Sequence, residues 1–370
     1  MNQGRTRTDI WTLVAAAFKE PGLALGAGAA VGLFLAISFV PMIGIFAGVF
    51  TPVPLLYYYQ LRGRVFGLTM IGAASLIVIL IYAVVDNLFG GLMFLEYALL
   101  AAVMGEGFRR GLRPEKVVGY AAGAVMGLAL LGLIFSGVFQ GRNPLDLARE
   151  TVARQVKVSL YFYESLLTGG PGQVSGPGPP PEAGKDPGAP QGGGDAYLKP
   201  GDPTKKAVEG GGLSENDFNS VVRVMVAIFP GLIMAVTFLV AWANFMFGRW
   251  LFTRKGVLPP ALADLTRWKA PERLVFVVIA CGFGVFLPVS QVKFICLNVL
   301  MVVGLLYFFQ GLAVVSYWLN KKGVPAFFRA FLYALIALQQ YLAMIIAALG
   351  LFDLWFDFRK LKKVGEGPQT

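Results

Sequence analysis

The chain has 370 residues, of which 56% are hydrophobic and only 14% are charged, whereas roughly 25% are charged in an ordinary soluble domain. Together with a mean hydropathy of +0.65, this composition excludes a soluble globular enzyme and predicts an all-α, polytopic transmembrane helical bundle. The formal net charge of +11 comes from basic residues in short loops between apolar runs. That pattern is typical of membrane proteins and argues against nucleic-acid binding.

The sequence contains no histidine, which excludes a Ser-His-Asp triad, a Cys-His pair, a HExxH zinc site and a histidine-ligated haem. Cys281 and Cys296 lie inside apolar runs and cannot build a disulfide framework or a cysteine-rich metal site. Neither a Walker A motif nor a GxSxG elbow is present. We therefore expect no enzymatic activity, no cofactor and no metal.

Residues 1–143 are predicted to form an N-terminal bundle of five spans. About 20 apolar residues are needed to cross a hydrocarbon core about 30 Å thick. Runs of roughly that length lie at about 22–40, 42–60, 65–85, 88–108 and 117–140. No cleavable signal pattern precedes the first run, so we expect it to be an uncleaved anchor.

Small residues recur every four positions in the first span. Two stripes result, one of Ala24, Gly28 and Gly32 and the other of Gly22, Gly26 and Ala30. Such stripes let two helix backbones approach closely inside a membrane. They are predicted either to pack within the bundle or to present a docking face to a partner subunit.

The second and fourth spans contain the candidates for solute binding. Pro52 and Pro54 are predicted to break the second helix near its middle, just before Tyr57 and Tyr58. Irregular backbone is tolerated in a membrane only beside a cavity, although the tyrosines would equally suit an aromatic belt at the interface.

Glu96 lies about 12 Å into the fourth span. A carboxylate at that depth is either a substrate or cation contact, or a structural group bonded to a neighbour.

A different kind of sequence follows the fifth span. Residues 144–168 are mixed in charge and are predicted to form an extracytoplasmic amphipathic helix. Residues 169–212 contain 14 glycines and 9 prolines, which no packed core tolerates, so they are predicted to be a disordered linker. The linker separates the N-terminal bundle from a C-terminal half at 213–370.

The C-terminal half is predicted to contain three or four spans, which makes eight or nine in the whole chain. Its apolar runs lie at about 222–248, 274–290, 294–318 and 326–352. Amides in these runs are predicted either to hydrogen-bond across helices or to line a polar cavity, and the candidates for lining it are Asn244, Gln310, Gln339 and Gln340. The segment 350–363 is predicted to be an amphipathic interfacial helix. Its candidates for partner contact are Asp353, Trp355, Asp357 and Arg359.

The distribution of lysine and arginine predicts a cytoplasmic N-terminus. Nine spans would then place the basic C-terminal residues Arg359, Lys360, Lys362 and Lys363 outside. Either the last run is a re-entrant hairpin broken near Gln339–Gln340, or the rule fails at this end of the chain.

Three segments carry a resemblance to a known family: Thr51–Leu56, Phe308–Val314 and Gly350–Lys360. They resemble the YybS-like family of predicted bacterial inner-membrane proteins, a domain family of unknown function, over nearly the whole chain except 169–212. That family is in turn similar, in its first five or six spans, to the S components of energy-coupling-factor vitamin transporters. In S components, small residues four apart on the first helix contact the coupling subunit. The matching positions here are Ala24, Gly28 and Gly32.

The leading expectation is therefore an S-component-like protein of a bacterial inner membrane that binds a small solute near Glu96 and Pro52–Tyr59. The resemblance implies a coupling subunit and an ATPase as partners, in addition to the lipid bilayer. The alternative is an envelope scaffold or regulator with no substrate, which acts through its small-residue stripes and its tail.

Overall fold

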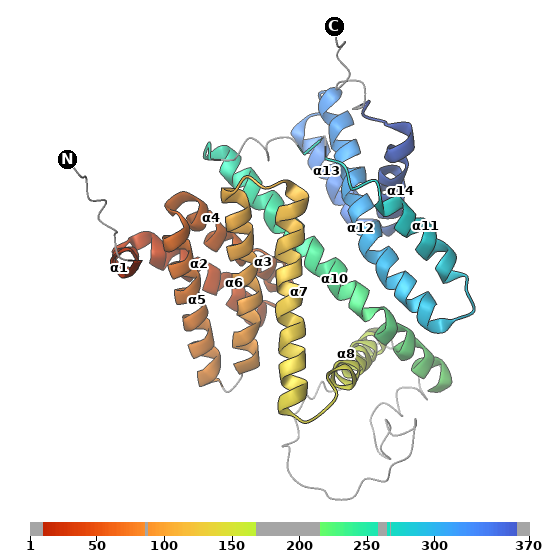
Figure 1. The fold of residues 1–370 in the computed structure, drawn as a ribbon, viewed down its shortest axis with the longest axis horizontal. Helices are drawn as coiled ribbons and strands as arrows, with labels where there is room; N and C mark the ends of the chain where they lie inside the picture. Colours follow the sequence, from red (N-terminus) through yellow and green to blue (C-terminus); the bar gives the residue numbers. More distant parts are fainter. Residues whose placement is uncertain (1–9, 86–87, 168–214, 258–264, 267, 361–370) are drawn as a thin grey trace, which may run out of the picture. The chain divides into compact units, whose positions relative to one another are not determined.

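The computed structural model describes residues 10–85, 88–167, 215–257, 265–266 and 268–360. These residues form helices and no strand (Figure 1). The predicted linker at 169–212 lies outside them, and so do the ends of the chain. The all-α fold expected from the composition is confirmed.

The first helices are α1 (Ile10–Lys19), α2 (Pro21–Phe39), α3 (Pro41–Val49), α4 (Pro52–Arg62), α5 (Arg64–Val84), α6 (Leu88–Arg109) and α7 (Pro114–Phe139). They are followed by α8 (Pro144–Leu167), α10 (Glu215–Arg254), α11 (Leu274–Val285), α12 (Ser290–Lys321), α13 (Ala326–Leu338) and α14 (Gln340–Phe356).

The helices belong to two compact units. Met1–Gly132 and Gly231–Thr370 form the first, and Leu133–Pro230 forms the second. The two halves expected from the sequence thus pack together in the first unit, because α10 lies against the N-terminal helices. Phe108 of α6 stacks on Phe245 and meets Phe252 edge-on, with ring centroids 5.2 Å apart in both pairs. The second unit contains α8, which forms where the amphipathic helix was predicted.

Of the helices in the described residues, six are long and apolar enough to cross a membrane, or seven if the bent pair α13–α14 counts as one span. The predicted count of eight or nine was approximate for two reasons. The second apolar run is divided between α3 and α4, and the run at 274–290 forms only the 12-residue helix α11.

The division of the second run is where the prolines predicted it. The helix α3 ends at Val49, and Pro52 occupies the first turn of α4, where a missing N–H costs no hydrogen bond. Asn244 of α10 is fully buried and donates from Nδ2 to the carbonyls of Val49, at 2.9 Å, and Val240, at 2.8 Å. One carbonyl at the end of α3 is thus satisfied across helices.

The last apolar run is also broken where it was expected to be. Gln339 is extended, with φ −102° and ψ 106°, and the axis bends by 104° between α13 and α14. The chain leaves α12 at Lys321, yet Phe358 lies in a pocket with Trp318 and Lys322 at that same end of α12. The chain therefore comes back to the end of α12 from which it left, as a re-entrant hairpin would, and the choice between a broken span and a re-entrant hairpin stays a prediction.

The tail departs from the prediction of a continuous amphipathic helix over 350–363. The helix ends at Phe356, and Asp357 adopts a left-handed conformation with φ 40° and ψ 58°. Asp357 N–H bonds the carbonyl of Asp353 at 3.1 Å, as in a common helix C-cap. A single regular helix therefore does not continue past Phe356.

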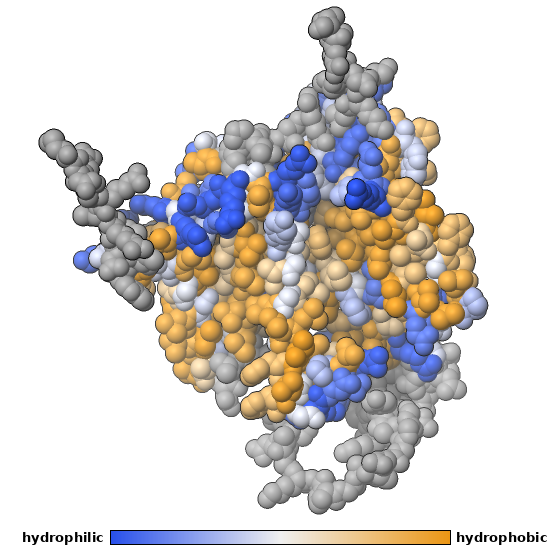
Figure 2. All heavy atoms as spheres, in the orientation of Figure 1, coloured by the Kyte–Doolittle hydropathy of each residue, from blue (hydrophilic) through white to orange (hydrophobic). Residues whose placement is uncertain are grey.

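The flanks of the first unit are apolar. Large side chains such as Leu80 (57% exposed) and Phe276 (70% exposed) face outward. Figure 2 shows apolar surface along α5, α6 and α7 and hydrophilic residues at the ends where α5 begins and α6 ends. This pattern is expected of helices surrounded by lipid.

Candidate functional site

Two of the segments that carry the sequence resemblance meet inside the first unit. Gly311 of α12 and Gly350 of α14 lie at a close crossing of these helices. A Cβ added to Gly311 would collide with the carbonyl of Ile346, and one added to Gly350 would collide with the carbonyl of Tyr307. Only glycine permits such an approach of two backbones. The crossing brings Gln310 and Asp353 together.

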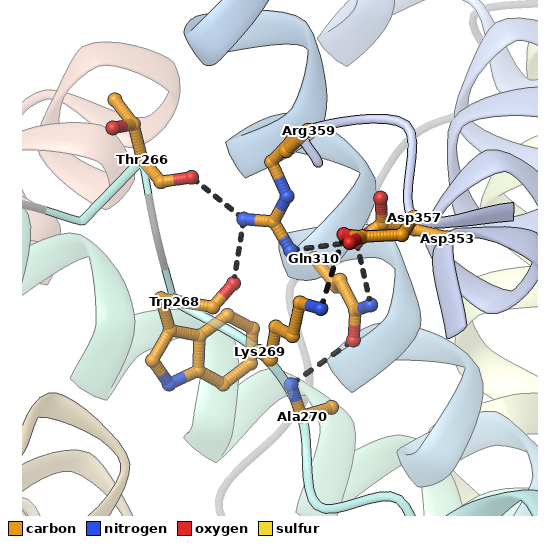
Figure 3. A network of polar contacts seen from close by, with 8 residues as sticks. All are labelled: Thr266, Trp268, Lys269, Ala270, Gln310, Asp353, Asp357 and Arg359. Carbon is orange, nitrogen blue, oxygen red and sulfur yellow. Dashed lines mark hydrogen bonds and ion pairs between the residues drawn. The ribbon is translucent and has the colours of Figure 1, made fainter. Parts of the chain in front are cut away.

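Gln310, Asp353 and Arg359 form a buried polar cluster (Figure 3). Arg359 Nη2 pairs with Asp353 Oδ2 at 2.6 Å, and both side chains are fully buried. Gln310 Nε2 donates to the same carboxylate oxygen at 3.2 Å, and Gln310 Oε1 accepts from Ala270 N–H at 3.0 Å. Every member of the cluster thus contacts a segment distant in sequence.

Arg359 also holds the segment that precedes α11. Its Nη1 donates to the carbonyls of Thr266, at 2.6 Å, and Trp268, at 2.9 Å. Lys269, in the same segment, pairs with Asp357 at 3.3 Å. The cluster therefore joins α12, the end of α14 and the segment that contains Thr266, Trp268 and Ala270 (Figure 3). A buried ion pair bonded on this many sides acts as a structural clasp, although Asp353 Oδ1 and Arg359 Nε have no hydrogen-bond partner among the described residues.

A second group of polar residues lines an open pocket in the N-terminal helices. This pocket, here called the Tyr59 pocket, has a volume of about 350 Å³, within the usual range for small-molecule sites. Its polar and charged lining residues are Tyr59, Arg64, Glu106, Arg110 and Tyr120. Apolar residues of α5, α6 and α7 complete the wall.

The charged side chains in the Tyr59 pocket differ in whether they form ion pairs. Glu106 accepts from Arg110 at 2.7 Å and from the Tyr59 hydroxyl at 3.2 Å. Arg64 is exposed and forms no ion pair with any described residue. The pocket therefore offers one guanidinium that forms no ion pair with a described carboxylate, although its charge acts on Glu106.

The predicted solute-binding residues are not gathered around this pocket. Pro52 is buried and Pro54 half-buried at the start of α4, while the half-buried Tyr58 packs against Gly22 and Gly26 of α2. Tyr57 contacts Tyr58 edge-on, with ring centroids 5.2 Å apart. The structure thus places these residues mainly in helix packing.

Glu96 is half-buried on α6. It forms no hydrogen bond or ion pair within the described part of the chain. Its neighbour Tyr97 packs edge-on against Phe34, with centroids 5.9 Å apart. The choice between substrate contact and structural carboxyl thus remains a prediction.

The four amides divide into two kinds. Asn244 and Gln310 are fully buried and hydrogen-bond across helices as described, which is the structural role foreseen for them. Gln339 and Gln340 are exposed at the bend between α13 and α14. They are therefore not buried amides, and neither of them lines the Tyr59 pocket.

The small-residue stripes of α2 also differ from each other. Gly22 and Gly26 lie against Tyr58, and Ala30 is fully buried. By contrast, Ala24, Gly28 and Gly32 are exposed, and a Cβ at Gly28 or Gly32 would meet no atom within 4 Å. The first stripe is intramolecular packing, and the second is an open face.

The tail residues proposed for partner contact are similarly divided. Trp355 is 58% exposed, whereas Asp353 and Arg359 are buried in the clasp and Asp357 is half-buried beside Lys269. Burial corrects the expectation for Asp353 and Arg359, since neither side chain reaches the surface.

Sequence reasoning included Tyr59 only as the end of the segment Pro52–Tyr59 and did not identify Arg64, Trp268 or Lys269 as site residues. A signal for the last two was the stretch Thr266–Pro271, in which basic and aromatic residues interrupt an otherwise apolar half. Arg64 was treated only as an orientation signal, because a loop arginine has that role by default.

Comparison with known proteins gives one match. The sequence model of a family described as "Predicted membrane protein (DUF2232)" matches residues 28–175 and 204–354. No curated protein and no solved structure matches the chain.

Proposed function

The chain belongs to the DUF2232 family of predicted membrane proteins, and from that premise we propose that it is a non-enzymatic, solute-binding component of a bacterial inner membrane. The observation that carries the proposal is the Tyr59 pocket, which combines an apolar wall with the unpaired Arg64 and the Tyr59–Glu106–Arg110 group. Such a combination suits a small solute with an apolar body and an anionic group.

The side on which the solute binds follows from the basic loops. The Tyr59 pocket lies where α5 begins and α6 ends, next to Arg62, Arg109 and Arg113. Loops rich in arginine stay in the cytoplasm, so the pocket opens to the cytoplasmic side and the N-terminus is cytoplasmic. The re-entrant α13–α14 pair then returns the basic tail to that same side, in agreement with the rule.

We expect replacement of Arg64 by glutamine to weaken solute binding about tenfold, the effect of losing one charge-assisted hydrogen bond. The measurement is native mass spectrometry of the full chain extracted gently from its host membrane, followed by titration of the small molecule found. Arg113→Gln is the matched control, because Arg113 is exposed and does not line the pocket. Equal retention by wild type and Arg64→Gln would refute the site.

The resemblance to S components supports an energising partner, namely a coupling subunit and its ATPase. The specific support is that Ala24, Gly28 and Gly32 form the open stripe of α2, while the neighbouring stripe is packed. The same observation favours the second candidate function, an envelope scaffold that binds another membrane protein through α2. Co-purification of an ATPase would favour transport, and its absence beside a stable partner would favour the scaffold.

Leucine substitutions on α2 separate partner binding from folding. Gly28→Leu should leave the thermal stability of the isolated chain unchanged, because the added side chain enters open space, and should abolish capture of a partner in a pull-down. Gly26→Leu should instead lower the melting temperature, since its side chain would collide with Tyr58 and Met70. Unchanged partner capture by Gly28→Leu would remove the docking role from this face.

A further inference from the structure

A second cavity lies in the C-terminal part of the first unit. It has a volume of about 360 Å³ and lies between the end of α12 and the returning tail. Its wall includes Val314, Val315 and Leu349, with Phe358 beyond the left-handed turn at Asp357. The charged residue in its lining, among the described residues, is Lys322. This cavity, here called the α12 pocket, is therefore apolar inside and positive at one end.

The residues at that end are typical of the membrane interface. Trp318 lines the α12 pocket, and Lys321 Nζ lies 5.0 Å from the centre of its indole ring. Tryptophan and lysine are enriched at the headgroup level of membrane proteins. Lys321, Lys322 and Lys360 are exposed, whereas the nearby acids Asp353 and Asp357 are paired with Arg359 and Lys269. The positive charge at the mouth is consequently not neutralised by these neighbours.

We propose that the α12 pocket binds one anionic phospholipid, with an acyl chain against Val314, Val315 and Leu349 and the phosphate-bearing headgroup beside Lys322. The apolar wall fits a hydrocarbon chain, and the lysines complement the negative headgroup. Residues 361–370 are a poor alternative occupant, because they contain only two large apolar residues, Leu361 and Val364. The lipid would fill the space between α12 and Phe358.

The proposal is tested by native mass spectrometry of the delipidated full chain, titrated with phosphatidylglycerol or phosphatidylcholine of identical acyl chains. We expect wild type to retain one phosphatidylglycerol more tightly than phosphatidylcholine. Lys322→Gln should weaken phosphatidylglycerol binding about fivefold, the effect of one lysine at an anionic surface. Lys293→Gln is the matched control, because Lys293 is exposed at the opposite end of α12 and should leave the affinity unchanged.

Val315→Trp should abolish retention of this lipid, because the indole ring would fill the cavity. If Val315→Trp does not fold, the affinity of Lys322→Gln for phosphatidylglycerol tests the proposal by itself. Equal affinities for the two lipids in wild type would overturn the proposal. It would also fail if Lys322→Gln and Lys293→Gln had the same effect, or if a lipid-free dimer showed that a second copy covers the pocket.

Discussion

Replacing Arg359 by leucine is expected to destabilise the protein by about 3–5 kcal/mol, the usual cost of removing one partner from a buried ion pair. Asp353 would be left charged and fully buried, with only Gln310 to bond it. The carbonyls of Thr266 and Trp268 would lose their shared donor as well. We expect a large fall in melting temperature and in the denaturant midpoint of the detergent-solubilised chain.

A double-mutant cycle tests whether the charge pair itself is responsible. Asp353→Leu combined with Arg359→Leu should be less destabilised than Arg359→Leu alone, because the double variant buries no unpaired charge. Lys360→Leu is the control, since Lys360 is exposed next to Arg359, and it should have little effect. If the two single losses simply added in the double variant, Arg359 and Asp353 would not act as a pair.

The contacts of Arg359 in the clasp could not be predicted from the sequence. A tail rich in aromatic residues and lysine predicted an amphipathic helix over 350–363, and that expectation requires a regular backbone throughout this segment. The left-handed turn at Asp357 ended the helix and turned Arg359 inward. Local propensity does not disclose such a turn, because its benefit comes from distant carbonyls at Thr266 and Trp268.

Other features could be predicted because their causes are local. The break before Pro52 follows from a missing N–H, and the Glu106–Arg110 pair follows from the spacing of neighbours on a helix. The two stripes of α2 could not be told apart, because Gly22–Gly26 and Gly28–Gly32 have identical spacing. The positions of Tyr58 on α4 and Met70 on α5 decide which stripe is covered.

The crossing of α12 and α14 supports the second large effect. Gly311→Ala is expected to destabilise the chain by about 1–3 kcal/mol or more, as overpacking usually does. The new methyl group would meet the carbonyl of Ile346, and a backbone atom cannot move aside as a side-chain end can. Separation of the two helices would also stretch the Gln310–Asp353 bond, which begins at the adjacent residue.

Gly304→Ala is the matched control on the same helix. Gly304 has open space where its Cβ would lie, so alanine should be neutral or stabilise α12 by up to about 1 kcal/mol through its higher helix propensity. Thermal denaturation of the two variants should therefore shift the melting temperature in opposite directions or leave Gly304→Ala unchanged. Equal shifts would mean that helix propensity, and not the close crossing at Gly350, determines the effect. A selective loss in Gly311→Ala would establish that the clasp depends on this backbone contact.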